Sequence, residues 1–194
     1  MLMRDTRKRV NLFIVGEQKC GTTSLFKLLS QHELVLGAKY KECNYFDSIK
    51  YEQDNGFKNY HHLFRRPVNI RYKYLLDASP AYLEDELAYK KVHEYNPDAK
   101  IIIILRNPVY RFISAYNFYF SNIIEELDLN YERFFQYAER GKAGYHYLKK
   151  HGNYTIEDFL KDEMNGVSPL GALRKGHYFP NIDKWERTFG EKNI

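Results

Sequence analysis

The sequence has no long apolar run and no stretch rich in glycine, proline or serine that would read as a linker. Its longest clearly apolar run is Ile101 to Leu105, whereas a helix that crosses a bilayer needs about 20 residues. The apolar stretch from Val10 to Gly16 behind the charged N-terminus is too short for the core of a signal peptide. We therefore expect no membrane span and a cytoplasmic location.

Cysteine is scarce as well, because the 194 residues include only Cys20 and Cys43. A chain of this mass buries roughly 70% of its extended surface, so its core needs no disulfide staple. In a reducing compartment both residues are expected to be free thiols. Without a repeat, linker or low-complexity tract, residues 1–194 are expected to form a single domain.

No block of one charge dominates, although 30 Lys+Arg against 25 Asp+Glu give a net charge of +5. The excess is dispersed over pairs such as Arg65-Arg66 and Lys149-Lys150. This fits an anionic ligand and argues against a nucleic-acid partner, for which no recognition motif is present. The histidines lack metal-ligand spacing, so no metal is expected.

What the chain does have is an alternation of apolar strands and helices, which predicts a three-layer α/β/α domain around a parallel sheet. The uninterrupted β-branched run within residues 100–105 is expected to be a central strand, buried on both faces. Expected strands cover residues 11–15, 33–36, 72–76 and 100–105, and expected helices follow at 25–29, 51–64, 79–96, 108–120, 130–138, 155–161 and 182–189.

Two of the helices carry the same start signal, a capping residue followed by proline. Ser79-Pro80 is expected to open one helix with Leu83, Leu87 and Val92 facing inward, and Asn107-Pro108 opens the other. The second helix is expected to present one apolar stripe, formed by Val109, Phe112, Ile113, Tyr116 and Phe120. The helix at 155–161 is expected to start with a capping box formed by Thr155 and Asp158.

Ligands of parallel sheets bind at the carboxyl ends of the strands, and distinctive polar residues follow all four expected strands. The first loop spaces its glycines like a P-loop, but it has Thr22 where a Walker A motif has lysine, and its own lysine is Lys19. Arg106 stands where a magnesium-binding aspartate would follow the last strand. The pattern therefore favours an anionic donor that needs no metal, such as a sulfuryl group, which carries about one negative charge.

The motifs at the strand ends resemble those of sulfotransferases that use 3′-phosphoadenosine 5′-phosphosulfate (PAPS), in the heparan sulfate or carbohydrate branch and its bacterial relatives. The motifs are Lys19-Cys20-Gly21-Thr22-Thr23-Ser24-Leu25, Lys41-Glu42-Cys43-Asn44-Tyr45-Phe46, Asp77-Ala78-Ser79-Pro80-Ala81-Tyr82 and the run from Arg106 to Tyr116. The resemblance implies a P-loop-like sulfotransferase fold and an enzyme of the EC 2.8.2 class. It further implies transfer of a sulfuryl group from PAPS to a hydroxyl or amine, with 3′-phosphoadenosine 5′-phosphate (PAP) as product.

The same resemblance assigns roles to individual residues. The loop Lys19, Cys20, Gly21, Thr22, Thr23 and Ser24 would hold the 5′-phosphosulfate, with Lys19 neutralising charge on the bridging oxygen. Arg106 and Ser114 would bind the 3′-phosphate. Glu42 would be the general base for in-line displacement, and Lys41 would position the sulfuryl group or acceptor and hold Glu42 ionised.

Two positions depart from the family pattern. Tyr45 replaces a phenylalanine, and Ala78 stands where the carbohydrate branch often has lysine, which favours a different acceptor. His32 is an alternative base by analogy with the phenol and steroid sulfotransferases, but it lies at an expected helix end and Glu42 fits its motif better.

Each residue also has an ordinary structural interpretation. Asp77, Ser79 and Tyr82 are expected to be structural, with Ser79 as helix cap and Asp77 as its partner. Aromatic residues near Tyr45, Tyr51 and Tyr60 could instead stack on a planar acceptor.

The acceptor is expected to be a glycan or a small molecule, with a lipid as an alternative, and to be selected by the segments 51–71 and 122–175. Competing hypotheses are a PAPS-binding or PAP-binding module with little turnover, and a magnesium-dependent kinase or NTPase. Relatives continue with a further strand, a helix and a basic loop that closes over the nucleotide, so Ile194 is expected to begin a strand that the sequence does not contain. The sequence leaves the oligomeric state open.

Overall fold

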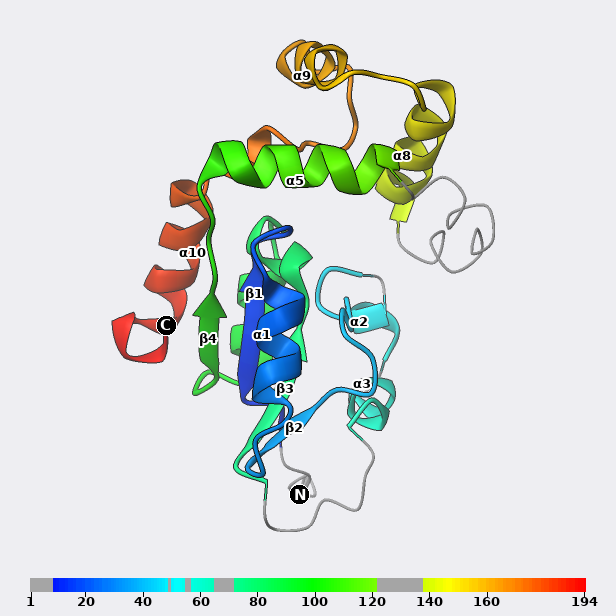
Figure 1. Cartoon of the computed structure of the whole chain (residues 1–194). Coiled ribbons are helices and arrows are strands. Elements are labelled where there is room, and N and C mark those ends of the chain that lie inside the picture. The colour runs from blue at the N-terminus through cyan, green and yellow to red at the C-terminus, as the bar shows by residue number, and fades with distance from the viewer. Residues whose placement is uncertain (1–8, 49, 55–56, 65–71, 122–137) are drawn as a thin grey trace. The chain divides into compact units, whose positions relative to one another are not determined.

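The computed structural model describes residues 9–48, 50–54, 57–64, 72–121 and 138–194, which fall into two compact units. The first unit lies within Met1–Leu105 and Phe179–Ile194, and the second is drawn from Arg106–Tyr178 (Figure 1). Elements of the first unit are β1 (Leu12–Gly16), α1 (Thr22–Leu29), β2 (Val35–Gly37), α2 (Lys50–Gln53), α3 (Lys58–His62), β3 (Tyr74–Ala78), η1 (Pro80–Leu83), α4 (Ala88–Tyr95), β4 (Lys100–Ile103), α10 (Phe179–Phe189) and η3 (Glu191–Asn193). Elements of the second are α5 (Pro108–Ser121), α8 (Ala138–Lys150), α9 (Ile156–Met164) and η2 (Arg174–Gly176).

The first unit is built on a parallel four-stranded sheet with the order β2-β3-β1-β4. In the register of the two inner strands, Phe13 lies opposite Asp77 and Ile14 lies opposite Ala78. Because the strands are parallel, the loops that follow β1 and β3 leave the same edge of the sheet. These two loops begin at neighbouring positions.

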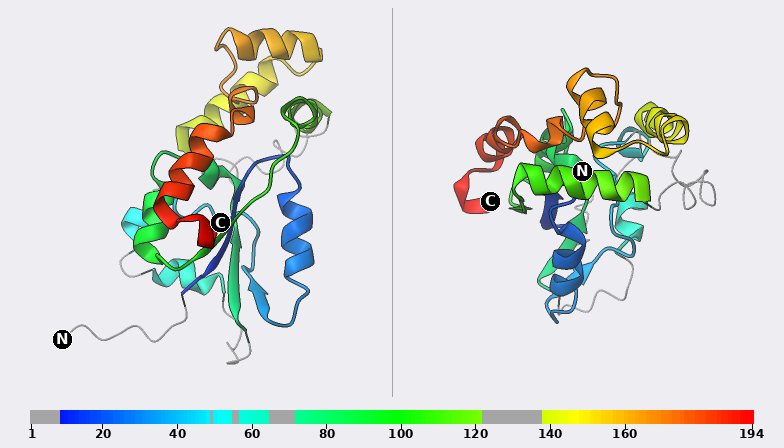
Figure 2. Two further views of the ribbon diagram at one scale, coloured as in Figure 1. Left: turned by 90° about the vertical axis from the view of Figure 1, so that its left-hand side faces the viewer. Right: turned by 45° about the horizontal axis from the view of Figure 1, so that its top comes forward.

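Helices cover both faces of this sheet, as the edge-on view in Figure 2 shows. Leu12 and Ile14 face α1 and join a cluster with Leu76 and Ala78. The alternate residues, Phe13 and Val15, belong to the core on the other face, which is completed by the aromatic loop after β2 and by α4 and α10. The α/β architecture with a central parallel sheet and flanking helices, expected from the sequence, is confirmed.

The second unit has its own apolar core between α5, α8 and α9. Phe159 is fully buried and stacks on Phe112 with ring centroids 5.3 Å apart. The capping box expected at the start of α9 is present, since Asp158 N–H donates to Thr155 Oγ1 and Thr155 N–H donates to the Asp158 carboxylate. Asn107 caps α5 as expected, because its Oδ1 accepts a hydrogen bond from the Val109 amide.

Three expectations about these elements were wrong. Strand β4 lies at the edge of the described sheet, with β1 on one side only, and it is not buried on both faces, since Ile101 is buried but Ile102 and Ile103 are half-buried. An apolar run does not by itself determine the position of a strand in the sheet. The expected helix over residues 79–96 is two elements, η1 and α4, and Leu87 between them is 48% exposed. The expected stripe of α5 is divided, since Phe112 is buried whereas Val109 and Ile113 are exposed.

The structure sharpens several element boundaries and leaves one expectation aside. The expected excursion over residues 51–64 contains the short helices α2 and α3, while the helix expected at 130–138 falls largely outside the described residues. Strand β3 runs to Ala78, so Asp77 lies inside the strand and not after it. Among the described residues, no helix is long and apolar enough to cross a membrane.

Candidate active site

The loop between β1 and α1 is held to the sheet by its backbone. Ile104 N–H donates to Gly16 O at 2.9 Å, and Glu17 N–H donates to Ile104 O at 2.8 Å. Lys19 and Gly21 both have positive φ, 67° and 97°, a region that a lysine enters only at a cost. Helix α1 then begins at Thr22 with no acidic residue in its first turn, so its N-terminal amides and dipole favour an anion there.

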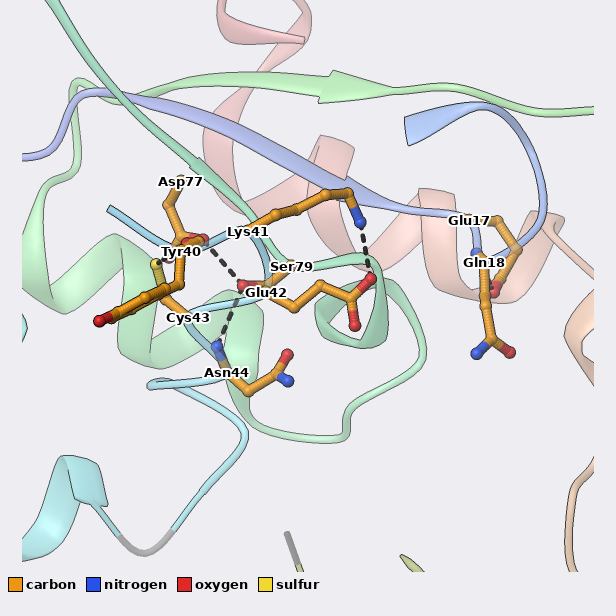
Figure 3. Close-up of polar contacts among 9 residues, drawn as sticks. All are labelled: Glu17, Gln18, Tyr40, Lys41, Glu42, Cys43, Asn44, Asp77 and Ser79. Carbon is orange, nitrogen blue, oxygen red and sulfur yellow. Dashed lines mark hydrogen bonds and ion pairs between the residues drawn. The ribbon is translucent and has the colours of Figure 1, made fainter. Parts of the chain in front are cut away.

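The turn after β2 carries Lys41 and Glu42 at the same edge of the sheet (Figure 3). The Lys41 ammonium lies 2.6 Å from Glu42 Oε1, and the Glu42 side chain is 52% exposed. Glu42 has φ 64°, and its N–H donates to Ala78 O at 3.0 Å, the end of β3. Glu42 N–H is thus bonded to the end of β3, where Ala78 lies opposite Ile14 of the neighbouring strand β1, and the first loop emerges from β1.

A fully buried carboxylate, that of Asp77, lies beneath this turn and accepts three O–H hydrogen bonds. Ser79 Oγ donates to Oδ1 at 2.8 Å, while the hydroxyls of Tyr60 and Tyr82 donate to Oδ2 at 2.8 and 3.1 Å. Two of these hydroxyls also bind the turn. Ser79 Oγ accepts from Asn44 N–H at 3.1 Å, and the Tyr82 hydroxyl accepts from Tyr45 N–H at 2.9 Å.

Burial sets the proton equilibria in this cluster. It raises the pKa of Tyr60 and Tyr82 well above the ordinary value, with help from the nearby Asp77 charge, so both hydroxyls carry protons to donate. Burial also raises the pKa of Asp77, against the hydrogen bonds from Ser79, Tyr60, Cys43 and Tyr82, which lower it. Asp47 directly follows the turn segment 42–46, and burial together with the charge of Asp85 raises its pKa to about 7.

Arg106 and Ser114 belong to the second unit. Arg106 lies three residues beyond the end of β4 and is exposed, and its carbonyl accepts a hydrogen bond from the Tyr178 hydroxyl. Ser114 is half-buried on α5, six residues after Pro108. The Lys19 loop and the Lys41–Glu42 turn therefore share the first unit, and the two residues expected to bind the 3′-phosphate share the second.

Several sequence-based interpretations need correction. Ser79 makes no side-chain cap of η1 and binds the turn after β2 instead. Tyr45 and Tyr60 stack on each other in the core, 3% and 0% exposed, and so offer no surface to an acceptor. The preference for Glu42 over His32 agrees with the structure, because His32 precedes β2, where its Nδ1 accepts a hydrogen bond from Leu34 N–H, whereas Glu42 follows that strand.

The expected pairing of Asp77 with Ser79 is confirmed, whereas the contacts of Asp77 with Tyr60 and Tyr82 and the link to the turn after β2 were not predicted from the sequence. Asp77 and Ser79 are two residues apart, which is the spacing of side chains on one face of an extended chain. That spacing was the available signal, but the partners Tyr60 and Asn44 come from segments far away in the sequence. Cys20 and Cys43 form no disulfide, and both are buried. No group of three potential metal-binding side chains occurs in the part of the chain that the structure describes.

Comparison with known proteins places this geometry in a family. The model of the sulfotransferase domain matches residues 9–194. The bifunctional heparan sulfate N-deacetylase/N-sulfotransferase 1 of Xenopus laevis is 36% identical over 200 residues, covering 94% of this chain and 19% of that protein. The heparan sulfate glucosamine 3-O-sulfotransferase 6 of Mus musculus is 33% identical over 110 residues, covering 57% of this chain and 30% of that protein.

A solved structure agrees with these matches. The crystal structure of a sulfotransferase from Alicyclobacillus acidocaldarius superposes with a TM-score of 0.68 at 25% identity, covering 97% of this chain and 72% of that one. The chain spans about a fifth of the length of the N-deacetylase/N-sulfotransferases that it matches. With the family model matched over residues 9–194, this chain belongs to the sulfotransferase domain family.

Proposed function

We propose that this domain transfers a sulfuryl group from PAPS to a hydroxyl or amine of an acceptor, with Glu42 as general base. The observation that carries the proposal is the backbone link between the two motifs. Glu42 N–H binds the end of β3, and β3 is in register with β1, from whose end the Lys19 loop starts. A base and an anion-binding loop thus share one edge of the sheet.

The residues of the first loop suit the phosphosulfate end of PAPS. The amides at the start of α1 and the positive end of its dipole can bind an anion. Gly21 leaves the backbone open to close approach, since an added Cβ would meet only Ile104, 3.7 Å away. Lys19 supplies a cation for the charge that develops on the leaving oxygen, and Arg106 and Ser114 supply a guanidinium and a hydroxyl for the 3′-phosphate.

In this mechanism Glu42 accepts the proton of the acceptor hydroxyl while the acceptor oxygen forms its bond to sulfur. The bond from sulfur to the bridging oxygen breaks at the same time, and PAP leaves with Lys19 balancing the negative charge on that oxygen. The exposure of the Glu42 side chain leaves its carboxylate accessible to an acceptor. Lys41 positions the carboxylate or the sulfuryl group.

A glucosamine-containing glycan is the acceptor class that the relatives' names suggest. Ala78, where the carbohydrate branch often has lysine, is buried in the α1-facing cluster and adds no cation. This difference supports an acceptor with less negative charge than a sulfated chain, such as a lightly sulfated glycan or a small hydroxyl compound.

A transfer screen with labelled PAPS tests the proposal, using de-N-sulfated heparan sulfate oligosaccharides and a simple phenol as acceptors. We expect label in at least one acceptor and nanomolar to micromolar calorimetric binding of PAP. Binding of PAP with no transfer to either class would favour a nucleotide-binding module over an enzyme. Magnesium-dependent hydrolysis of ATP without PAP binding would contradict the proposal altogether.

A further inference from the structure

We propose that Asp77 is a positioning residue that holds the catalytic turn at Glu42 through the hydroxyls of Ser79 and Tyr82. This inference rests on the proposed function, because it concerns the placement of the proposed base. Asp77 does not touch the Glu42 side chain. It acts through two intermediaries, each of which binds both the buried carboxylate and a backbone amide of the turn.

The turn depends on these acceptors for its backbone hydrogen bonds. Glu42 N–H binds Ala78 O, Asn44 N–H binds Ser79 Oγ, and the amides of Tyr45 and Phe46 both point to the Tyr82 hydroxyl, at 2.9 and 3.4 Å. Four amides of residues 42–46 are thus anchored to the end of β3 and the residues directly after it. Figure 3 shows the hydrogen bonds that lead from Asp77 through Ser79 to Asn44.

The carboxylate decides which way the two hydroxyls point. A hydroxyl has one hydrogen to donate, and its lone pairs face the remaining directions. Because Asp77 accepts the hydrogens of Ser79 and Tyr82, both oxygens present lone pairs to the amides of the turn. A side-chain amide at position 77 would donate to one of these hydroxyls and turn its hydrogen toward an amide hydrogen, which breaks the contact.

The turn needs such bracing because its backbone is strained. Glu42 and Asn44 have φ values of 64° and 44°, in the left-handed region that residues other than glycine rarely adopt. Strained backbone of this kind persists only where the surroundings over-determine it, and it gathers at functional sites. Without its acceptors the turn can relax to ordinary φ values, which would move the Glu42 carboxylate away from the acceptor oxygen.

The structure provides a matched pair of variants that separates positioning from general stability. Tyr82→Phe and Tyr60→Phe each remove one fully buried hydroxyl that donates to Asp77 Oδ2. Of these two hydroxyls, that of Tyr82 also binds the backbone of the turn, whereas that of Tyr60 binds Asp77 and no other group among the described residues. A purely structural role predicts equal effects on activity, and a positioning role predicts different ones.

We expect both variants to lower the melting temperature by similar amounts, while only Tyr82→Phe lowers kcat. The expected loss is about ten- to hundredfold, as for other displaced catalytic groups, with PAP affinity within twofold of wild type. Asp77→Asn should show the same split in a more severe form, where it folds. Unchanged kcat in Tyr82→Phe, or an equal loss of kcat in Tyr60→Phe, would overturn the proposal.

Hydrogen exchange gives a second readout that does not require catalysis. Amides of residues 42–46 should exchange faster in Tyr82→Phe than in Tyr60→Phe, while peptides from α9 remain unchanged in both. If the wild-type protein transfers no sulfate, the proposed function fails and this exchange difference still decides the role of Asp77. Equal exchange in the two variants would refute that role whatever the activity.

Discussion

Asp47 should make the stability of the domain fall as the pH rises from about 4 to about 7. Burial and the neighbouring charge of Asp85 raise its pKa from 3.8 to about 7, and its Oδ1 atom has no hydrogen-bond partner among the described residues. The folded state therefore holds a proton that the unfolded chain gives up at lower pH. Its contribution to stability is complete below pH 4 and is lost as the pH passes through the folded pKa.

The size of the effect follows from the two pKa values. At about 1.4 kcal/mol per pKa unit, the difference between 3.8 and about 7 corresponds to at most about 4 kcal/mol. Asp47→Asn keeps a neutral side chain of the same shape at every pH. Between pH 5 and pH 8 we expect the free energy of unfolding of the variant to gain about 3 kcal/mol relative to wild type.

Urea denaturation at four pH values between 5 and 8 measures this gain, with Asp98→Asn as a control for the loss of an exposed negative charge. The control should shift the free energy of unfolding by a small, nearly constant amount. A gain in the free energy of unfolding of Asp47→Asn over wild type that stays constant with pH, or that is largest at pH 5, would show that Asp47 does not hold a proton in the folded state at neutral pH.

Three further predictions concern the donor loop and the two cores. Lys19→Ala should weaken PAP binding by about tenfold or more in calorimetry, since it removes a charged hydrogen-bond donor, and unchanged affinity would remove Lys19 from the site. Gly16→Ala should lower the free energy of unfolding by about 1–3 kcal/mol in urea, because the new Cβ would lie 2.5 Å from Leu83 Cβ; wild-type stability would mean that this contact relaxes freely. Phe159→Ala should cost about 3–5 kcal/mol in the same assay, because its ring is fully buried, and a cost below about 1 kcal/mol would show that the core of the second unit is loosely packed.

Local signals in the sequence were enough to predict the succession of strands and helices along the chain and the polar residues at the strand ends. Several of these signals depend only on neighbours within four residues. They include the strand before Gly16, the cap and proline at Asn107-Pro108 and the capping box at Thr155. Such features depend on the local sequence and need no contact with distant segments. The proximity of Lys41 and Glu42 could also be predicted from the sequence, because the two residues are adjacent in the chain.

The remaining features depend on contacts between distant segments. Whether β4 is central or at an edge is decided by which strand pairs with it, and its apolar run carries no such information. The carboxylate of Asp77 accepts hydrogen bonds from Tyr82 and Tyr60, which are 5 and 17 positions away, and the Tyr82 hydroxyl in turn binds Tyr45 N–H, 37 positions away from it. A buried carboxylate with hydroxyl partners leaves only scattered polar residues in the sequence, so it was interpreted as a local cap.

The most direct test of the account compares wild type with Glu42→Gln in the labelled-sulfate assay, with PAP binding measured by calorimetry on both proteins. Glutamine keeps the size and the backbone contacts of the residue but cannot accept the acceptor's proton. We expect transfer by the wild type, loss of transfer in Glu42→Gln and PAP affinities within twofold of each other. Transfer by Glu42→Gln at the wild-type rate would contradict this expectation.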